Sequence, residues 1–529
     1  MPPPPKMPDN IPSPPATTDF LWGVATSAYQ SEGGYNGPGE PQTNWAEAET
    51  RQEVMPSGQA ADFWNCYEAD FATCQKMGLT AFRLGIEWSR VQPRAANAAS
   101  QGGPPPFDLD ALERYGDIIA SCRNHGLEPI VTLHHFVHPA WLGSDPWLSP
   151  AIQKPFLLFV KTAVTHINQT LVEKHGLAPI RYYLTINEPN TLAVNTYLGN
   201  QFPGHGSRGF ANFSRCLNQL LVAHVRAYNA IHDLHEANGW GRPEVSLNNY
   251  CSDLYWSDKV LLDLLAFRER GIARENLRAY LATKSGEFKT TLKAAKLPLR
   301  RGLLSFIGIL VKRYLESKGK RLFTAKPFAP LLDTIQASPR KRFLDFIALD
   351  YYDPFMAHSF RVPMLADHEF KTKTFRAWLE ACFVSKWWDW RVLPRGMHFF
   401  CAYYSRDFQG RDILIAENGM ALRRRPDNRH THRRDRYTRS TFLRQHVTEA
   451  MKMVHDGIPL IGYLHWSLFD NYEWGSFTPR FGLFSLDYTR DTGRVVEDHL
   501  GDRPSETYAR LVCQAKENTP QISPAGPMN

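Results

Sequence analysis

Apolar runs of strand length recur along the chain and alternate with stretches of helical spacing. Eight such runs lie at residues 20–30, 81–90, 127–135, 180–189, 244–250, 346–353, 412–419 and 459–468. Between them, residues 62–78 and 110–126 repeat apolar positions at the helical period, and each stretch ends in a glycine. Strands that alternate with helices predict βα units and a parallel sheet. Eight units favour a closed (β/α)8 barrel, a TIM barrel of the α/β class, over an open sheet.

Polar and aromatic residues gather at the C-terminal ends of these runs. They are Gln30, Glu87, Trp88, His134, His135, Asn187, Glu188, Tyr351, Tyr352, Glu417, Asn418 and Trp466. In a barrel, those ends form one face, which is where active sites are built. A single polar strand end could simply approach solvent. Their recurrence on nearly every strand favours a functional site at this face.

The segments outside the runs set the predicted domain limits. Residues 1–18 are rich in proline and lack the apolar stretch of a secretory signal, so we expect a flexible arm there. Residues 19–515 are predicted to form one catalytic domain, since α/β barrels often run long. Residues 516–529 are predicted to be a C-terminal tail.

Composition narrows the class of protein. No apolar stretch reaches the ~18 residues that a membrane span needs. The eight cysteines show no CxxC spacing, which argues against a zinc site and against a disulfide framework. We therefore expect a cytoplasmic, reduced protein.

The net charge of +8 is concentrated in one segment. Residues 258–326 carry 17 Lys or Arg against 6 Asp or Glu, and the rest of the chain is slightly acidic. This excess lies in a long stretch between the fifth and sixth runs, residues 255–340, within which residues 293–321 place a short apolar run between basic clusters. Such a segment could cover the active site as a lid or lie peripherally on an anionic membrane. The alternative is a pair of extra helices packed on the barrel with a solvated basic face.

Two carboxylates stand out among the strand-end residues. Glu188 and Glu417 each follow an apolar run, at the fourth and seventh predicted strands. Either could be a solvent-facing strand end or a cap of the next segment. As a pair across the barrel mouth, they are typical of glycoside chemistry, in which one carboxyl protonates the leaving oxygen and the other meets the oxocarbenium-like carbon.

The motifs around these residues resemble family 1 of the glycoside hydrolases, the β-glucosidase and β-galactosidase family. The resemblance rests on "TINEPN" (185–190), "IAENGM" (415–420), the opening "FLWGVATSAYQSEG" (20–33) and the closing "GYLHWSLFDNYEWGSFTPRFGLFSLDY" (462–488). It implies a retaining β-glycosidase for a terminal β-D-glucoside, galactoside or fucoside, with Glu417 as nucleophile and Glu188 as acid/base. The resemblance also implies sugar-binding and nucleophile-supporting residues. The sugar-binding set is Gln30, His135, Asn187, Trp466, Glu473 and Trp474, and the supporting pair is Arg83 and Tyr352.

Several positions depart from the family pattern. Phe136 stands where the family has Trp, and Asp350 stands where it has Asn. Asp350 adds a negative charge near the two glutamates, which could raise a pKa or repel a charged sugar. The stretch "EWGSFTPRFG" (473–482) is one residue shorter than usual, and its loop contacts the 4- and 6-hydroxyls in the family. The glycone therefore stays open, although no added basic residue there indicates a 6-phosphate.

Other functions compete with this one. A transglycosylase acting on a hydrophobic or lipid-linked acceptor would use the same residues. An inactive sugar-binding relative is disfavoured because both glutamates are present. His134, His135 and His138 do not predict a metal site, since neighbouring residues on a strand face opposite sides. We expect no cofactor, and the basic segment has no base-stacking motif that would indicate nucleic-acid binding.

Overall fold

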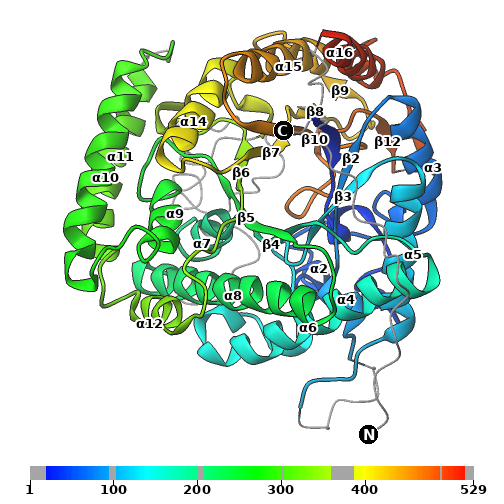
Figure 1. Cartoon of the computed structure of the whole chain (residues 1–529). Coiled ribbons are helices and arrows are strands. Elements are labelled where there is room, and N and C mark those ends of the chain that lie inside the picture. The colour runs from blue at the N-terminus through cyan, green and yellow to red at the C-terminus, as the bar shows by residue number, and fades with distance from the viewer. Residues whose placement is uncertain are drawn as a thin grey trace, which may run out of the picture.

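Eight parallel strands form a closed barrel at the centre of the chain, seen along its axis in Figure 1. They pair in the order β1-β10-β7-β6-β5-β4-β3-β2. Their bounds are β1 Leu21–Ala25, β2 Ala81–Gly85, β3 Glu128–Thr132, β4 Tyr182–Asn187, β5 Glu244–Tyr250, β6 Ile347–Tyr351, β7 Ile413–Asn418 and β10 Leu460–Trp466. Each strand lies within one of the eight predicted runs, so the predicted (β/α)8 barrel is confirmed.

The computed structural model describes residues 20–94, 103–199, 208–299, 303–358, 387–488 and 491–518. The predicted N-terminal arm, residues 1–18, lies outside the described residues. The last helix continues to Asn518 and therefore enters the predicted tail, whose remaining residues also lie outside this part of the chain.

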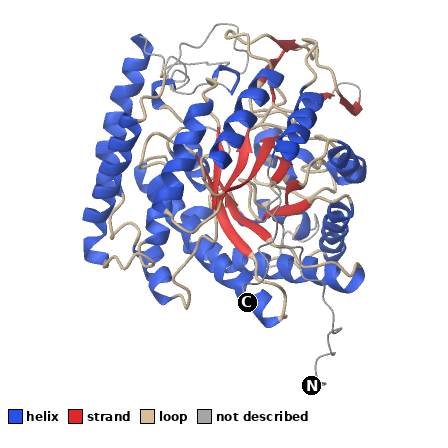
Figure 2. Cartoon of the chain, turned by 45° about the horizontal axis from the view of Figure 1, so that its top comes forward, coloured by secondary structure: helices blue, strands red, loops and turns tan. Residues whose placement is uncertain are grey.

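Helices surround the barrel on all sides (Figure 2). Those before β5 are α1 Ala28–Ser31, α2 Ala46–Thr50, α3 Phe63–Lys76, α4 Trp88–Val91, α5 Leu109–Asn124, α6 Gln153–Gln169, α7 Pro189–Tyr197 and α8 Phe210–Ala237. Those after β5 are α9 Lys259–Ala266, α10 Leu277–Ala294, α11 Leu303–Leu322, α12 Ala329–Ala337, α14 Pro394–Asp407, α15 Arg439–His455 and α16 Pro504–Asn518. Short strands outside the barrel are β8 Leu422–Arg424, β9 His430–Thr431, β11 Pro479–Arg480, β12 Ser485–Asp487 and β13 Asp491–Val495.

The two helices predicted at residues 62–78 and 110–126 are α3 and α5. Each is followed by a glycine with positive φ, Gly78 at +74° and Gly126 at +73°. Only glycine adopts this conformation at little cost, so it ends the helix and turns the chain toward the next strand.

Side chains fill the inside of the barrel, so it is a packed core and not an open channel. The inward-facing cluster is made of alternate strand residues, among them Leu21, Ala81, Ile130, Leu184, Ala348, Leu414 and Leu464. The outward-facing strand residues pack against the helices in a second, larger cluster. Because the interior is a packed core, space for a ligand opens only beyond the strand ends.

Four helices, α9 to α12, occupy the stretch between β5 and β6 that was singled out for its charge. Figure 1 places α10 and α11 at the outer left edge of the barrel, and Lys289 of α10 forms an ion pair with Glu316 of α11. Among the described residues, no helix combines the length and the apolar content needed to cross a bilayer. The cytoplasmic location stays a prediction.

Candidate active site

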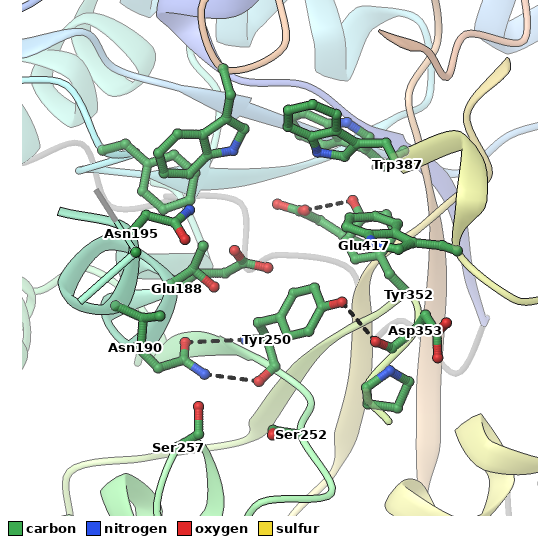
Figure 3. A pocket seen from close by; sticks show the side chains of 18 of the residues that line it. Glu188, Asn190, Asn195, Tyr250, Ser252, Ser257, Tyr352, Asp353, Trp387 and Glu417 are labelled. Carbon is green, nitrogen blue, oxygen red and sulfur yellow. Dashed lines mark hydrogen bonds between the residues drawn. The ribbon is translucent and has the colours of Figure 1, made fainter. Parts of the chain in front are cut away.

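A cavity of about 500 Å³ opens at the C-terminal ends of the barrel strands (Figure 3). Seven of the ten predicted site residues line it: His135, Glu188, Tyr352, Glu417, Trp466, Glu473 and Trp474. The other three lie directly behind the wall. Gln30 donates a hydrogen bond to Glu473. Arg83 donates one to Glu417 and another to Asn187. The structure thus brings all ten residues together.

Glu188 and Glu417 project into this cavity from the ends of β4 and β7 (Figure 3). Carboxylate oxygens of the two lie within 4.8 Å of each other. The barrel pairing slips by one residue just before each of these glutamates, between Leu184 and Asn187 in β4 and around Ala416 in β7. Such irregularities re-aim side chains beside active sites. The hydrophobic pattern gave no sign of them.

The backbone of Glu188 adopts a left-handed conformation, with φ 38° and ψ 61°. This is costly for a non-glycine residue, and Pro189, the first residue of α7, also restricts it. The Glu188 N–H donates to the Asn248 carbonyl at 2.8 Å and so holds this conformation. Phe136 and Trp474, on the same cavity wall, also have positive φ. Strain concentrated at three cavity residues is typical of a functional site.

Glu417 has a hydrogen-bond donor on each carboxylate oxygen. Arg83 Nη1 donates to Oε1 at 2.6 Å, and the Tyr352 hydroxyl donates to Oε2 at 2.8 Å. Burial raises the pKa of Glu417, whereas the Arg83 charge and these two hydrogen bonds lower it. Both donors therefore favour the ionised form, and they fix the orientation of the carboxylate.

Glu188 lies in different surroundings. Its Oε1 is buried without a hydrogen-bond partner among the described residues. Burial, and next the charge of Glu417, raise the pKa of Glu188 well above its ordinary value. The two glutamates therefore have different surroundings: burial and a neighbouring negative charge favour the protonated form of Glu188, whereas two donors favour the ionised form of Glu417.

The inner end of the cavity presents polar groups suited to hydroxyls. Glu473 Oε2 accepts hydrogen bonds from Gln30 Nε2 at 3.3 Å and Trp466 Nε1 at 3.2 Å. Its other oxygen has no hydrogen-bond partner among the described residues, and Glu473 lines the cavity. The ring of His135 stacks on Trp466 with centroids 5.6 Å apart. Burial lowers the pKa of His135 well below its ordinary value, so this ring is neutral.

The outer end of the cavity is aromatic. Phe136 packs on Trp474 at 4.7 Å, and Tyr250 stacks on Tyr352 at 5.9 Å. Further apolar residues that line this end are Leu198, Phe355, Met356, Trp387 and Trp390. Sequence reasoning missed most of them. Tyr250 and Asn248 carry the signal used for the other strands, polar groups at a strand end, whereas Trp387 and Trp390 follow no strand pattern.

Several strand-end residues have structural tasks instead. Glu87 accepts from the Ser89 N–H and so caps α4, and burial raises the pKa of Glu87 to about 7. The Tyr351 hydroxyl donates to the Leu393 carbonyl, and Asn418 accepts from Tyr463. None of these three is among the described residues that line the cavity. For them, the simpler interpretation of a strand end is correct.

The three neighbouring histidines have separate surroundings. His134 packs against Trp147 and Phe156, His135 against Trp466, and His138 Nε2 lies 3.1 Å from the Gly143 carbonyl oxygen. Among the described residues, the group of three side chains with the spacing of metal ligands is Glu188, Asp350 and Glu417. Asp350 is therefore a third carboxylate beside the two glutamates.

Comparison with known proteins matches this arrangement. The family model of glycosyl hydrolase family 1 matches residues 14–270 and 271–499. A 6-phospho-beta-galactosidase of Lacticaseibacillus casei is 27% identical over 488 residues, 89% of this chain and 93% of that protein. Beta-glucosidase A of Thermotoga maritima is 25% identical over 495 residues, 90% and 94% of the two chains. The solved family 1 β-glucosidase from Thermotoga maritima superposes with a TM-score of 0.63 at 20% identity, covering 94% of this chain and 98% of that one. This chain is therefore a β-glycosidase that belongs to glycosyl hydrolase family 1.

Proposed function

We propose that this enzyme hydrolyses terminal, unphosphorylated β-D-glycosides with retention of configuration. The observation that carries the proposal is the proximity of the Glu188 and Glu417 carboxylate oxygens, within 4.8 Å. Retaining enzymes hold their two carboxyls about 5–5.5 Å apart, whereas inverting enzymes hold them about 6.5–9.5 Å apart to admit a water. The observed spacing suits direct attack on the sugar.

In the first step, a Glu417 oxygen bonds to the anomeric carbon while the bond from that carbon to the glycosidic oxygen breaks. The Glu188 proton passes to the leaving oxygen. In the second step, a water oxygen bonds to the anomeric carbon, the ester bond to Glu417 breaks, and Glu188 takes up the water proton. Asn187 supports the sugar, because its Oδ1 accepts from Arg83 and Asn248 while its buried Nδ2 has no described partner and is free to donate to the sugar 2-hydroxyl.

The glycone is a neutral sugar of gluco, galacto or fuco configuration. Gln30, His135, Trp466, Glu473 and Trp474 would hold it. The strongest hydrogen bonds to a 6-phosphate come from cationic donors, but among the described residues that line the cavity there is no Lys or Arg, and Glu473 adds a carboxyl group. This sets the proposal apart from the 6-phospho-β-galactosidase relatives.

The aromatic outer end favours a hydrophobic aglycone. Phe136, Tyr250, Trp387 and Trp390 offer apolar faces that would pack against an alkyl or aryl group. An alcohol of the same kind could replace water in the second step, since both acceptors attack the same glycosyl-enzyme. Transglycosylation is thus the second candidate function, favoured by this apolar end.

We also infer that α11 contacts an anionic lipid surface. Phe306, Leu310 and Tyr314 are 59%, 45% and 54% exposed and, four residues apart, share one face of the helix. Arg313, Lys320 and Arg321 are exposed on the same helix, and no ion pair involves them among the described residues. An apolar stripe beside unpaired cations complements an anionic bilayer.

The other face of α11 packs onto the rim of the cavity. Gly308 approaches the Met356 carbonyl so closely that a Cβ there would lie 2.2 Å from its oxygen. Lys312 Nζ pairs with Asp253 at 2.9 Å, and Asp253 in turn accepts from the Met356 N–H. Because Met356 lines the cavity, a lipid surface against α11 would lie near the aglycone end.

Nitrophenyl β-glucoside, β-galactoside, β-fucoside and 6-phospho-β-galactoside test the catalytic proposal, with the anomer of the first product followed by NMR. We expect turnover of unphosphorylated substrates with retention, and a fall of roughly 10³-fold or more in Glu417→Gln. Glu244→Gln, the same change at the opposite end of the barrel, should stay active. Inversion, or preference for the 6-phosphate, would contradict the proposal. Alkyl alcohol acceptors added to the same assay separate transfer from hydrolysis.

Vesicle co-sedimentation tests the α11 contact. Vesicles of phosphatidylglycerol and phosphatidylcholine should retain the enzyme at low salt, and phosphatidylcholine alone should not. The triple change Phe306→Ser, Leu310→Ser and Tyr314→Ser should release it. Leu158→Ser, which removes a 44% exposed leucine on α6, is the matched control. Equal binding of the triple variant and wild type would refute the contact.

A further inference from the structure

Asp350 is a buried carboxyl with a direct place in the catalytic cluster. It is the fourth residue of β6, is 0% exposed, and lies in register with Glu417 on the adjacent strand β7. One oxygen each of Glu188, Asp350 and Glu417 lies within 4.8 Å of the others. The site therefore holds three carboxyls where double displacement uses two.

The hydrogen-bond donors around the cluster are unevenly distributed. Arg83 directs Nη1 to Glu417 and to the Ala416 carbonyl, Nη2 to Asn187 and Nε to Thr132. Asp350 receives one donor, Asn248 Nδ2 on Oδ2, while its Oδ1 is buried without a described partner. Glu188 Oε1 is also buried without a described partner. Glu188 and Asp350 are therefore the two carboxyls of the cluster that each have an oxygen without a hydrogen-bond donor among the described residues.

The charges around the cluster also indicate that the three carboxyls are not all ionised. Groups facing Asp350 are Arg83 from β2, Glu188 from the end of β4, the Cys251 thiol after β5, Tyr352 after β6 and Glu417 from β7. Burial raises the pKa values of Cys251 and Tyr352 well above their ordinary range, so both are neutral. Among these described neighbours, Arg83 is the single cation. Three ionised carboxylates would leave a buried net charge of −2, which is strongly unfavourable.

We propose that Asp350 is a positioning residue that shares one proton with Glu188, so that the resting site holds a hydrogen-bonded acid pair beside ionised Glu417. The proposal rests on the acid/base role given to Glu188 above. Two neighbouring carboxyls that cannot both ionise hold a proton between them. Asp350 accepts the Glu188 O–H and thereby orients it. When Glu188 gives this proton to the glycosidic oxygen, the pair becomes doubly ionised, and it regains the proton when Glu188 deprotonates the attacking water.

The negative charge of Asp350 has a measurable consequence. Two neighbouring carboxyls resist double ionisation, so loss of the proton that the pair shares sets the alkaline limb of kcat/KM. Asp350→Asn keeps the shape and the contact with Asn248 but removes the charge and the proton acceptor. We expect its alkaline limb to move to lower pH by roughly one unit or more. Asp350→Glu, which retains a carboxylate, should keep the alkaline limb near the wild-type position.

The experiment is the pH dependence of kcat/KM on a nitrophenyl β-glycoside that the wild type turns over. Asp412→Asn, a change at an exposed Asp just before β7 and thus at the far end of the barrel, should leave both limbs in place. A folded Asp350→Asn variant with an unmoved alkaline limb would overturn the proposal, because a purely structural Asp350 predicts that result. If Asp350→Asn does not fold, Asp350→Ser takes its place, and its alkaline limb must move to lower pH in the same way for the proposal to stand. Wild type without any turnover would instead refute the proposed function itself.

Discussion

Arg83 Nη1 lies 2.6 Å from Glu417 Oε1, and the guanidinium is completely buried. The same guanidinium holds Asn187 through Nη2 at 2.6 Å. One cation thus connects β2, β4 and β7 and fixes both Glu417, the proposed nucleophile, and Asn187, the neighbour of the proposed acid. The relationship spans 334 residues of chain and exists only because the barrel closes.

Loss of this cation should move the acid limb of activity. In Arg83→Gln, Glu417 loses the charge that lowers its pKa, so the acid limb of kcat/KM should move to higher pH by roughly one unit or more. Arg83→Lys keeps the charge but not the planar fork, so its acid limb should stay while kcat falls. If the acid limb of a folded Arg83→Gln variant stayed in place, the charge of Arg83 would not control the ionisation of Glu417, and the prediction would be wrong.

The acid/base role predicts a dependence on the leaving group. Glu188→Gln cannot protonate the departing oxygen, so turnover of alkyl glycosides should fall by roughly 10²–10⁴-fold. Dinitrophenyl glycosides, whose leaving group needs no proton, should be affected far less in the first step. Added azide, which needs no base, should restore the second step and give a β-glycosyl azide. Equal loss on both substrates would contradict the assignment.

The glycone end predicts a role for Glu473 in sugar binding. Burial raises the pKa of Glu473 to about 8, and Gln30 and Trp466 both donate to it. Glu473→Gln removes an acceptor for a sugar hydroxyl, and a buried polar group that is left without its partner costs about 1–3 kcal/mol. We expect kcat/KM on the preferred β-glycoside to fall by roughly 5–150-fold. Unchanged kcat/KM for every glycoside would place the sugar elsewhere.

Burial of the carboxyls also predicts how stability varies with pH. Burial raises the pKa of Asp350 well above its unfolded value, so its stabilising contribution is complete below about pH 4 and is lost as pH rises through the folded pKa. The Asp350→Asn variant has no carboxyl to ionise at this position, so its stability does not fall with pH for this reason. The Tm of the variant relative to wild type should therefore increase between pH 5 and pH 8, by roughly 1 °C per kcal/mol for a domain of this size. Thermal unfolding at both pH values measures it, and a relative Tm that falls with pH would contradict the burial argument.

The barrel and most of the site were predictable from sequence because both follow local patterns. Each strand is an apolar run bounded by polar residues, and parallel strand ends meet at one face. The motifs around Glu188 and Glu417 then assigned the chemistry. The prediction failed where a strand-end residue caps a helix, as Glu87 does, because capping and catalysis use the same residue types.

Three-dimensional closure created the features that sequence could not indicate. Gln30 and Glu473 bond across 443 residues, and neither position alone specifies the partner. The left-handed backbone of Glu188 and the slipped registers of β4 and β7 depend on neighbouring strands. Trp387 and Trp390 reach the cavity from a segment without strand or helix periodicity. The departure at Asp350 was visible in the sequence, but its hydrogen-bond partners were not.

Covalent trapping tests the central claim most directly. A 2-deoxy-2-fluoro β-glycoside of the preferred sugar should slow the second step and leave a glycosyl ester, which peptide mapping by mass spectrometry can locate. The assignment predicts one sugar per chain, attached to Glu417, and no adduct in Glu417→Gln. An adduct on Glu188 or Asp350, or continued turnover by Glu417→Gln at the wild-type rate, would contradict it.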